Sequence, residues 1–387
     1  MPSATRPSRW RRMPAGVSPN FSARSTAVEG PDSRIARATW SRVRRSSEGA
    51  MVFTTELLRN SVPHATLRVW HLSHPKIDGE PGSITRLRAV AGARNAVLLK
   101  LSSLMVFTQS AIVVTGAAVR ITGSGLGCST WPECTPGSYT PTPDQPEAPL
   151  HAWIEFGNRL LTFVLLLNAL ALMLTILRSG ERNLRKLGAL QIIGILAQGV
   201  LGGITVLTGL NPATVAAHFL LSIVLIAGAL SLRQRAHGKT PTAIRVIPLV
   251  KKLLWAHLLL TIAVLVMGTI VTGSGPHAGD STAERFDLDS KMMAWIHADL
   301  VIALLGTTIA LAIAIRLGES EITKTVVGNL ALRFLIVALA QGAIGYIQYF
   351  TGLPELIVGA HVTGAVLVWL FAWNIAITGN LFARKGA

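Results

Sequence analysis

A spaced motif that ends in a histidine occurs twice in this chain. Residues 196–218 read LAQGVLGGITVLTGLNPATVAAH, and residues 339–361 read LAQGAIGYIQYFTGLPELIVGAH. Leu-Ala-Gln-Gly, Thr-Gly-Leu and Ala-His recur at one constant offset, which indicates a tandem duplication with His218 and His361 at matching positions. A duplicated histidine within an apolar segment indicates a metal ion or a tetrapyrrole held between helices.

A third histidine lies at a similar depth in the second copy. His297 is about five residues and His361 about six residues into an apolar segment, or about 9 Å at 1.5 Å per residue. Ionisable side chains in such segments are rare and usually functional. Two neutral imidazoles on opposing helices form a bis-histidine site for a haem iron, which is the site that this pair predicts. The alternative is that each histidine only hydrogen-bonds a neighbouring helix.

The first copy differs from the second at one of these positions. His218 is present, but the position that corresponds to His297 is Asn158, in the segment IEFGNR. An amide is a poor iron ligand, so we expect this copy to hold a tetrapyrrole loosely or on one side, as a substrate. Glu155 lies one turn from Asn158 on the same helix face, where a carboxylate is suited to proton transfer. Arg159 pairs either with a propionate or with Glu155, and the second pairing would only lock the helix.

Cys128 and Cys134 are the only two cysteines, and they lie in the segment CSTWPEC. We expect this segment in a loop on the exoplasmic side, an oxidising location in bacteria, which favours a disulfide. A metal site needs more ligands than the loop supplies. Free thiols are the remaining alternative.

The elements that carry these residues are long apolar segments. Charged residues make up 14% of the chain, against roughly 25% in soluble domains. Each apolar run is long enough to cross a bilayer, and only a helix or a closed barrel satisfies the backbone there. Strand alternation is absent, so we predict an all-α, polytopic membrane protein. The predicted spans are 101–119, 152–177, 188–208, 212–232, 253–273, 292–315, 330–350 and 355–382.

The charge pattern predicts the orientation of these spans. The net charge is +17, but the basic residues carry no aromatic interleaving or motif typical of nucleic-acid binding. They gather before the first span, in the loops after the second and fourth spans, and in the tail, whereas acidic residues gather in the opposite loops. The positive-inside rule therefore predicts cytoplasmic termini, with the histidines toward the exoplasmic side.

The duplication predicts the domain organisation. Four spans per copy would give two four-helix bundles related by a pseudo-two-fold axis along the membrane normal. Glycines in the repeated segments are typical of close helix contacts. The predicted parts are a disordered basic cytoplasmic extension at 1–96, an N-terminal half at 97–235, a cytoplasmic linker at 236–252, a C-terminal half at 253–382 and a cytoplasmic tail at 383–387.

As a set, these motifs resemble those of the haem A synthase family over about residues 97–382. They are TGSGLGC…C at 122–134, EFGNR at 155–159 and the two LAQG…AH segments. The resemblance implies eight helices in two halves, a haem b bound by His297 and His361, and a substrate haem in the N-terminal half. It also implies roles for His218, Glu155 and the loop cysteines Cys128 and Cys134.

One departure from the family concerns the substrate ligand. Many members have a histidine on the second span where this chain has Asn158. Either Asn158 leaves that face of the substrate iron open, or His151 takes part. His151 is two turns away, about 10 Å along the helix, so we favour the open face.

The resemblance implies an oxidoreductase acting on a CH or CH2 group, in haem A biosynthesis for terminal oxidase assembly. The C8 methyl of haem O would become a formyl group through two hydroxylations and loss of water. Haem b would relay electrons, Glu155 would handle protons, and Asn158 and Arg159 would position the substrate bound at His218. The expected partners are haem O, membrane lipid, haem O synthase (protohaem farnesyltransferase) and further copies of this chain.

The alternative is a haem-binding electron carrier or a haem transporter in the cell membrane, without chemistry of its own. An electron carrier across the membrane would place haems at both faces. Every candidate ligand here lies toward one face, which favours the enzyme.

Overall fold

The computed structural model describes residues 81–238 and 244–382, with side chains from Ala96 onward, and this part of the chain is helical without strands. The major helices are α1 (Pro81–Ile121), α2 (Pro149–Ser179), α3 (Arg182–Leu207), α4 (Pro212–Ala236), α5 (Pro248–Ser274), α6 (Ser290–Gly318), α8 (Asn329–Phe350) and α9 (Glu355–Thr378). A short α7 (Glu321–Thr323) and a π-helical turn (Lys324–Gly328) lead into α8.

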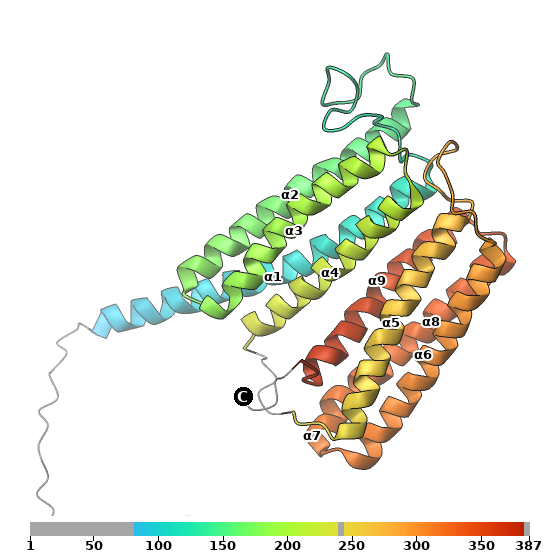
Figure 1. Ribbon diagram of the computed structural model, residues 1–387. Coiled ribbons are helices and arrows are strands. Elements are labelled where there is room, and N and C mark those ends of the chain that lie inside the picture. Colours follow the sequence, from blue (N-terminus) through green and yellow to red (C-terminus); the bar gives the residue numbers. More distant parts are fainter. Residues whose placement is uncertain (1–80, 239–243, 383–387) are drawn as a thin grey trace, which may run out of the picture. The chain divides into compact units, whose positions relative to one another are not determined.

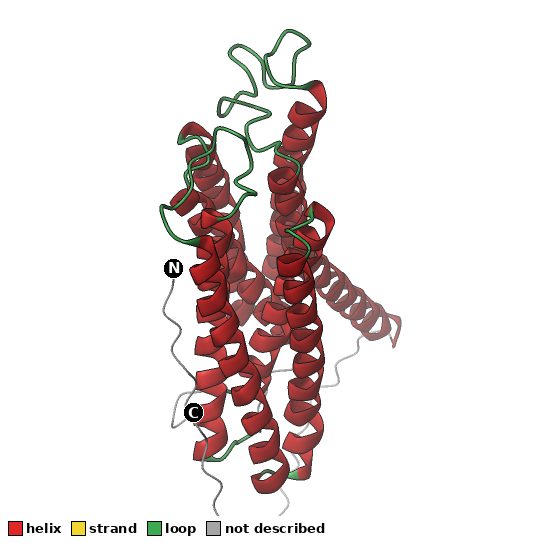
Figure 2. Ribbon diagram, turned by 90° about the vertical axis from the view of Figure 1, so that its right-hand side faces the viewer, coloured by secondary structure: helices red, strands yellow, loops and turns green. Residues whose placement is uncertain are grey.

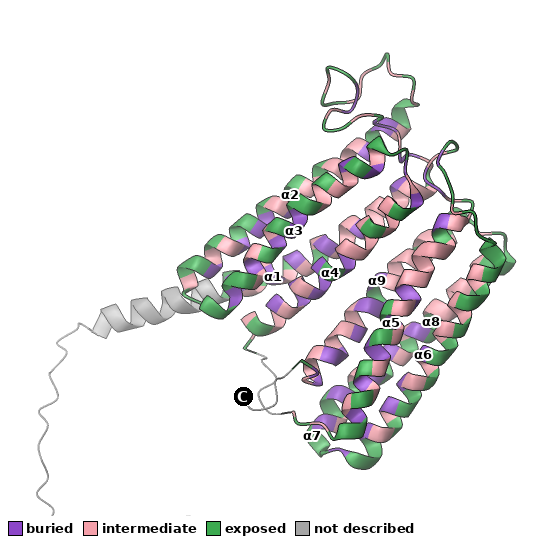
Figure 3. Cartoon of the chain, viewed as in Figure 1, coloured by how far each residue is buried: buried purple, intermediate pink, exposed green. Residues whose placement is uncertain are grey.

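Eight of these helices are long and apolar enough to cross a membrane, with α8 counted together with its lead-in segment, which confirms the predicted all-α membrane fold. Between 17% and 44% of each apolar window is buried inside the protein. Exposed residues follow the outer faces of all these helices (Figure 3), and many of them are large and apolar. Such a surface would be unfavourable in water but has the same polarity as lipid tails.

The eight spans form two closed rings of four. In the first ring α1 packs on α2, α2 on α3, α3 on α4 and α4 on α1; in the second α5 packs on α6, α6 on α8, α8 on α9 and α9 on α5 (Figure 1). Helices α2 and α4 are therefore diagonal partners in the first ring, as α6 and α9 are in the second. A symmetry axis relating the two rings stays a prediction.

The two rings meet through α1, α4, α5 and α9. One hydrophobic core runs across this contact, because Val113, Ile223 and Ile226 of the first ring belong to the same buried cluster as the core of the second. The indole N–H of Trp369 on α9 donates to the carbonyl oxygen of Ile223 (2.8 Å), and that of Trp373 donates to the hydroxyl of Ser231 (2.8 Å).

Local signals set the helix ends next to the candidate site. Proline occupies the first turn of α2 and α4, where its missing N–H costs no helical hydrogen bond. Asn211 caps α4 by accepting from the backbone N–H of Ala213 (3.0 Å), and Asp289 caps α6 by accepting from that of Met292 (2.9 Å). Histidines a few residues into α4 and α6 are thereby held at a fixed depth.

Four connecting loops gather at one end of the helices: 122–148, 208–211, 275–289 and 351–354 (Figure 2). We call this the disulfide end, because the first of these loops carries Cys128 and Cys134. The two long loops touch, since the backbone N–H of Gly125 donates to the carbonyl oxygen of Gly279 (2.9 Å).

The predicted domain boundaries stay predictions. Helix α1 begins at Pro81, inside the segment expected as a basic extension, and its membrane-compatible part is Ala96–Ile121. Most of that extension, the centre of the linker and the tail lie outside the described residues.

Candidate functional site

Two histidines face each other across the second ring. His297 on α6 and His361 on α9 have ring centres 6.5 Å apart, with 69° between the ring planes. Two imidazoles that bind one iron through a single nitrogen each would have centres roughly 6 Å apart, since each metal–nitrogen bond is about 2 Å. The spacing therefore fits a bis-histidine iron site on diagonal helices.

Each of these imidazoles packs against a glycine on the helix next to it. A Cβ atom at Gly268 on α5 would lie 3.4 Å from Cε1 of His297, and one at Gly345 on α8 would lie 3.2 Å from Cε1 of His361. A larger residue at either position would push the imidazole toward the middle of the ring of helices. The glycines thus give each histidine room beside its own helix pair.

The first ring repeats this arrangement with one change. His218 on α4 lies against Gly202 on α3, where a Cβ would be 3.2 Å from its Cε1 atom. Asn158 on α2 lies against Gly116 on α1, with 3.9 Å from a Cβ there to its Nδ2 atom. The site residues on the second, fourth, sixth and eighth spans thus each meet a glycine of the preceding span, which supports the correspondence of Asn158 with His297. The hydroxyl of Thr115 donates to Oδ1 of Asn158 (2.7 Å) and fixes its amide.

The imidazole nitrogens remain available for a ligand. Nδ1 of His218, His297 and His361 is buried without a hydrogen-bond partner. A bare metal ion is a poor fit, because no group of three or more His, Cys, Asp or Glu side chains occurs there. A porphyrin brings four nitrogen ligands of its own and needs only one or two imidazoles.

Glu155 and Arg159 form a buried ion pair at the disulfide end of α2. Glu155 is 5% exposed, and its Oε1 accepts from Nη2 (2.6 Å) and Nε (3.1 Å) of Arg159. Its Oε2 accepts from the backbone N–H of Cys128 (2.7 Å). Of the two pairings considered for Arg159, the pairing with Glu155 is present. Both carboxylate oxygens are therefore engaged, one by the helix and one by the loop.

Arg159 also binds the loop directly. Its guanidinium donates to the carbonyl oxygens of Cys128 (2.8 Å), Thr130 (3.0 Å) and Glu133 (3.2 Å). Cys128 and Cys134 form a disulfide, as predicted, and both are buried. The disulfide closes the turn of chain whose carbonyl groups converge on Arg159. The ion pair thus anchors this loop on the first ring, which spacing alone did not predict.

The loop also reaches α3. A Cβ atom at Gly203 would overlap the indole of Trp131, so Gly203 is needed for this contact. Gly127 is equally confined, because a Cβ there would overlap the backbone of His151. His151 therefore lies under the loop at the start of α2. Its imidazole makes no hydrogen bond within the described residues, and its role as an alternative ligand stays a prediction.

Two histidines without an assigned role have structural contacts. A ring nitrogen of His277 hydrogen-bonds the carbonyl oxygen of Leu353 (2.9 Å), which joins two loops at the disulfide end. His257 is buried on α5, with its ring centre 4.4 Å from that of Phe334. Both histidines thus have contacts apart from the pair formed by His297 and His361.

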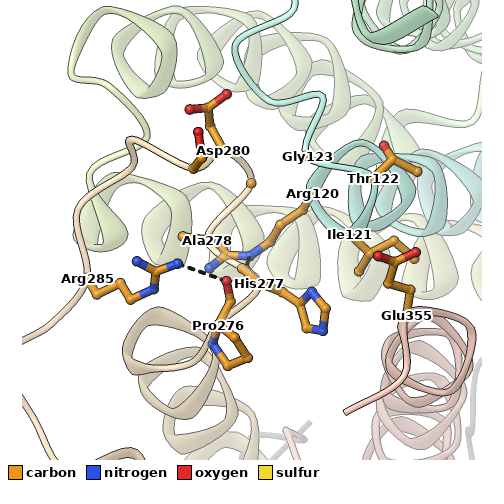
Figure 4. Close-up of a pocket in the computed structure, with 12 residues that line it drawn as sticks. Arg120, Ile121, Thr122, Gly123, Pro276, His277, Ala278, Asp280, Arg285 and Glu355 are labelled. Carbon is orange, nitrogen blue, oxygen red and sulfur yellow. Dashed lines mark hydrogen bonds between the residues drawn. The ribbon is translucent and has the colours of Figure 1, made fainter. Parts of the chain in front are cut away.

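A pocket of about 250 Å³ lies where the end of α1, the 275–289 loop and the start of α9 meet (Figure 4). Arg120 donates from Nε to the carbonyl oxygen of His277 (2.6 Å) and from Nη2 to that of Thr272 (3.1 Å). Arg285 donates to the carbonyl oxygens of Gly275 (2.9 Å) and Pro276 (3.0 Å). The guanidinium of Arg120 thus ties the first ring to the second, above the level of the histidines.

Together these features define a multi-pass, α-helical membrane protein with two polar sites toward one end of its helices. The chain belongs to the family of cytochrome oxidase assembly proteins, because the family model COX15-CtaA matches residues 96–373. The family inferred from the sequence motifs is thereby confirmed.

Three curated relatives are named heme A synthase. That of Lysinibacillus sphaericus is 37% identical over 124 residues, which are 31% of this chain and 39% of the relative. That of Shewanella oneidensis is 32% identical over 147 residues, which are 35% of this chain and 44% of the relative. That of Exiguobacterium sibiricum is 29% identical over 186 residues, which are 47% of this chain and 61% of the relative. The match thus spans less than two thirds of each relative.

Proposed function

We propose that this protein is a haem A synthase, an oxidoreductase that converts the C8 methyl group of haem O to a formyl group. The observation that carries the proposal is the asymmetry between the rings. The second ring has two imidazoles 6.5 Å apart, His297 and His361, whereas the first has His218 on the diagonal partner of the helix that carries Asn158. The names of the relatives support this reaction.

The second ring is the proposed site of haem b, the cofactor, and His297 and His361 are the residues that would hold its iron. When bound, haem b supplies one-electron transfer. The chain contributes the two imidazoles and the glycines that leave room for them, Gly268 and Gly345. Two protein ligands would retain the cofactor more firmly than one.

The first ring is the proposed site of haem O. One imidazole, from His218, would hold the substrate iron, and the amide of Asn158 would leave the other face open. Thr115 holds that amide in one orientation through the 2.7 Å hydrogen bond to Oδ1. A single protein ligand suits a molecule that must enter and leave.

Glu155 is the proposed proton-transfer residue. It lies one helical turn from Asn158 on the same face of α2, which supports a position beside the substrate. Arg159 and the N–H of Cys128 hold its carboxylate in place. We propose that Glu155 acts from this fixed position, and that Asn158 and Arg159 orient the substrate and the loop.

The orientation in the membrane is part of the proposal. Basic residues in the loops opposite the disulfide end favour cytoplasmic termini, which puts both haem sites toward the exoplasmic face. Haem O synthase and a homo-oligomer remain candidate partners on grounds of function alone.

The test of the function is pigment chromatography. The full chain is expressed with a source of haem O, and the extracted haems are separated and quantified. We expect haem A to accumulate in cells that carry this chain and not in cells with an empty vector. If only haem O and haem B are found, the protein is a carrier or transporter and not the enzyme.

The axial ligands are tested separately by spectroscopy of the purified protein. His361→Ala or His297→Ala should remove the low-spin haem spectrum, because each variant leaves the iron with one protein ligand. His277→Ala is the matched control, since its imidazole binds a loop carbonyl outside the site, and it should keep the spectrum. A low-spin spectrum that persists in both ligand variants rules out this pair.

A further inference from the structure

The glutamine of each Leu-Ala-Gln-Gly motif binds the backbone of the histidine that ends the same motif. Nε2 of Gln341 on α8 donates to the carbonyl oxygen of His361 on α9 (2.6 Å). Nε2 of Gln198 on α3 donates to the carbonyl oxygen of His218 on α4 (3.0 Å). The same contact therefore occurs in both copies, between the same two spans.

Each glutamine works together with the glycine one turn later on its helix. Gln341 and Gly345 are four residues apart and so lie on one face of α8, as Gln198 and Gly202 do on α3. The glutamine holds the backbone of the histidine, and the glycine receives the edge of its imidazole. One helix thereby fixes the neighbouring histidine at two points.

In the second copy, a glycine on α9, Gly364, leaves room for the amide of Gln341. A Cβ atom at Gly364 on α9 would overlap Oε1 of Gln341, so a larger residue there would force the amide of Gln341 to move. The matching position of the first copy is Leu221. In that copy, Gln198 makes a second hydrogen bond, from Nε2 to the hydroxyl of Ser222 (2.6 Å). Gly364 is thus a partner of Gln341 that helix packing alone does not require.

The contact also has an energetic cost. Oε1 of Gln341 and Oε1 of Gln198 are buried without a hydrogen-bond partner. A buried polar atom without a hydrogen-bond partner destabilises the folded protein. A side chain that served only to pack the helices would avoid this cost if it were apolar.

We propose that Gln341 is a positioning residue that sets the orientation of His361 toward the haem iron, and that Gln198 does the same for His218. This inference rests on the proposed haem ligation. Residues that orient a metal ligand change affinity and electronic structure at the metal without touching it. The glutamines hold their histidines through the backbone carbonyl group, and Nδ1 of each imidazole has no protein partner.

The test uses Gln341→Met, which keeps the length of the side chain and removes the N–H donors. Haem b affinity of the full-length protein should fall about 10- to 100-fold, as for other residues that support a metal ligand. The electron paramagnetic resonance g-values of the remaining low-spin haem and its midpoint potential should shift. The apoprotein should keep its thermal unfolding temperature, because the substitution is apolar and of similar size.

Gly364→Ala provides a second variant that leaves Gln341 in place. Its methyl group displaces the amide, so it should reproduce the shifted g-values and potential. In a Gln341→Ala background the same substitution should add little, because the group that it displaces is gone. Leu221→Ala, at the matching position of the first copy, should leave the haem b signals unchanged.

Gln198→Met is the matched control for the site. It should weaken haem O binding and leave the g-values and potential of haem b unchanged. Unchanged haem b signals in both Gln341→Met and Gly364→Ala would overturn the inference, as would equal effects of Gln341→Met and Gln198→Met on haem b. Haem b that persists in His361→Ala would instead overturn the proposed ligation, so the two failures are distinguishable.

Discussion

At the scale of single residues, Glu155 combines two tasks. Its Oε2 atom holds the N–H of Cys128, and its Oε1 atom holds Arg159, whose guanidinium binds three further groups of the disulfide loop. A carboxylate with both oxygens engaged is well placed but not free to move. Its proposed part in proton transfer must therefore use a fixed geometry next to the substrate.

Glu155→Gln should separate the two tasks. The amide keeps the size of the side chain and one acceptor for the N–H of Cys128. It cannot take up and release a proton as a carboxyl group does. We expect haem A formation to fall by roughly 10²- to 10⁴-fold, the usual contribution of a general acid or base. Haem chromatography of the cell extract measures this loss.

The haem b spectrum and the cysteines provide the controls for that variant. Haem b should be retained, because its proposed ligands lie in the second ring. Both cysteines should resist maleimide labelling, as expected while the disulfide is intact. Normal haem A formation would contradict the proton-transfer role, whereas labelled cysteines would show that the disulfide had opened.

At the scale of elements, the site depends on pairs of neighbouring helices. Helices α1, α3, α5 and α8 each present a glycine to the site residue on the following span: Gly116, Gly202, Gly268 and Gly345. Because these glycines have no side chain, an imidazole or an amide fits between the two neighbouring helices. Overpacking such a position costs about 1–3 kcal/mol and moves the neighbouring group.

Gly345→Val should displace the imidazole of His361, because even a Cβ atom would lie 3.2 Å from its Cε1 atom. We expect at least a ~10-fold loss of haem b affinity, equivalent to the ~1.4 kcal/mol within that overpacking range. Haem titration of the apoprotein measures it. Gly342→Val, on the same helix, has no atom within 4 Å of its Cβ position and is the control. If both variants bind haem b alike, Gly345 has no special role.

At the scale of the whole molecule, the two rings share one core rather than two. Trp369 is 4% exposed, and its indole crosses from α9 to the carbonyl oxygen of Ile223 on α4. Gln234 on α4 also hydrogen-bonds Asn374 on α9. These contacts hold the proposed cofactor ring and the proposed substrate ring at a fixed separation, which electron transfer between two haems requires.

Trp369→Ala should lower the free energy of unfolding by about 3–5 kcal/mol, the usual cost of truncating a buried aromatic residue. Thermal unfolding of the full chain in detergent, followed by circular dichroism, measures the change. Trp255→Ala is the control, because Trp255 is 39% exposed on α5, and it should cost less than about 1 kcal/mol. Equal losses would show that Trp369 does not stabilise the contact between the rings.

The sequence by itself determined the eight helices and the depth of the histidines. An apolar segment of this length without strand alternation forms a helix in a bilayer. The position of a histidine along that helix then sets its depth, at 1.5 Å per residue. The repeat identified His218 and His361, and the two cysteines left one pairing. Arg159, by contrast, had two alternatives, and only the structure shows its pairing with Glu155.

Tertiary structure decided which groups meet across helices. The sequence identifies Gln341 only as a polar residue of a repeated motif. Its hydrogen bond to the carbonyl oxygen of His361 depends on how α8 and α9 are rotated relative to each other. The contacts of Gly268 with His297 and of Trp131 with Gly203 are of the same kind. Hydropathy and spacing fix positions along a helix, but the rotation of each helix is set by side chains from its neighbours, and the loop over the first ring is set by hydrogen bonds that no spacing encodes.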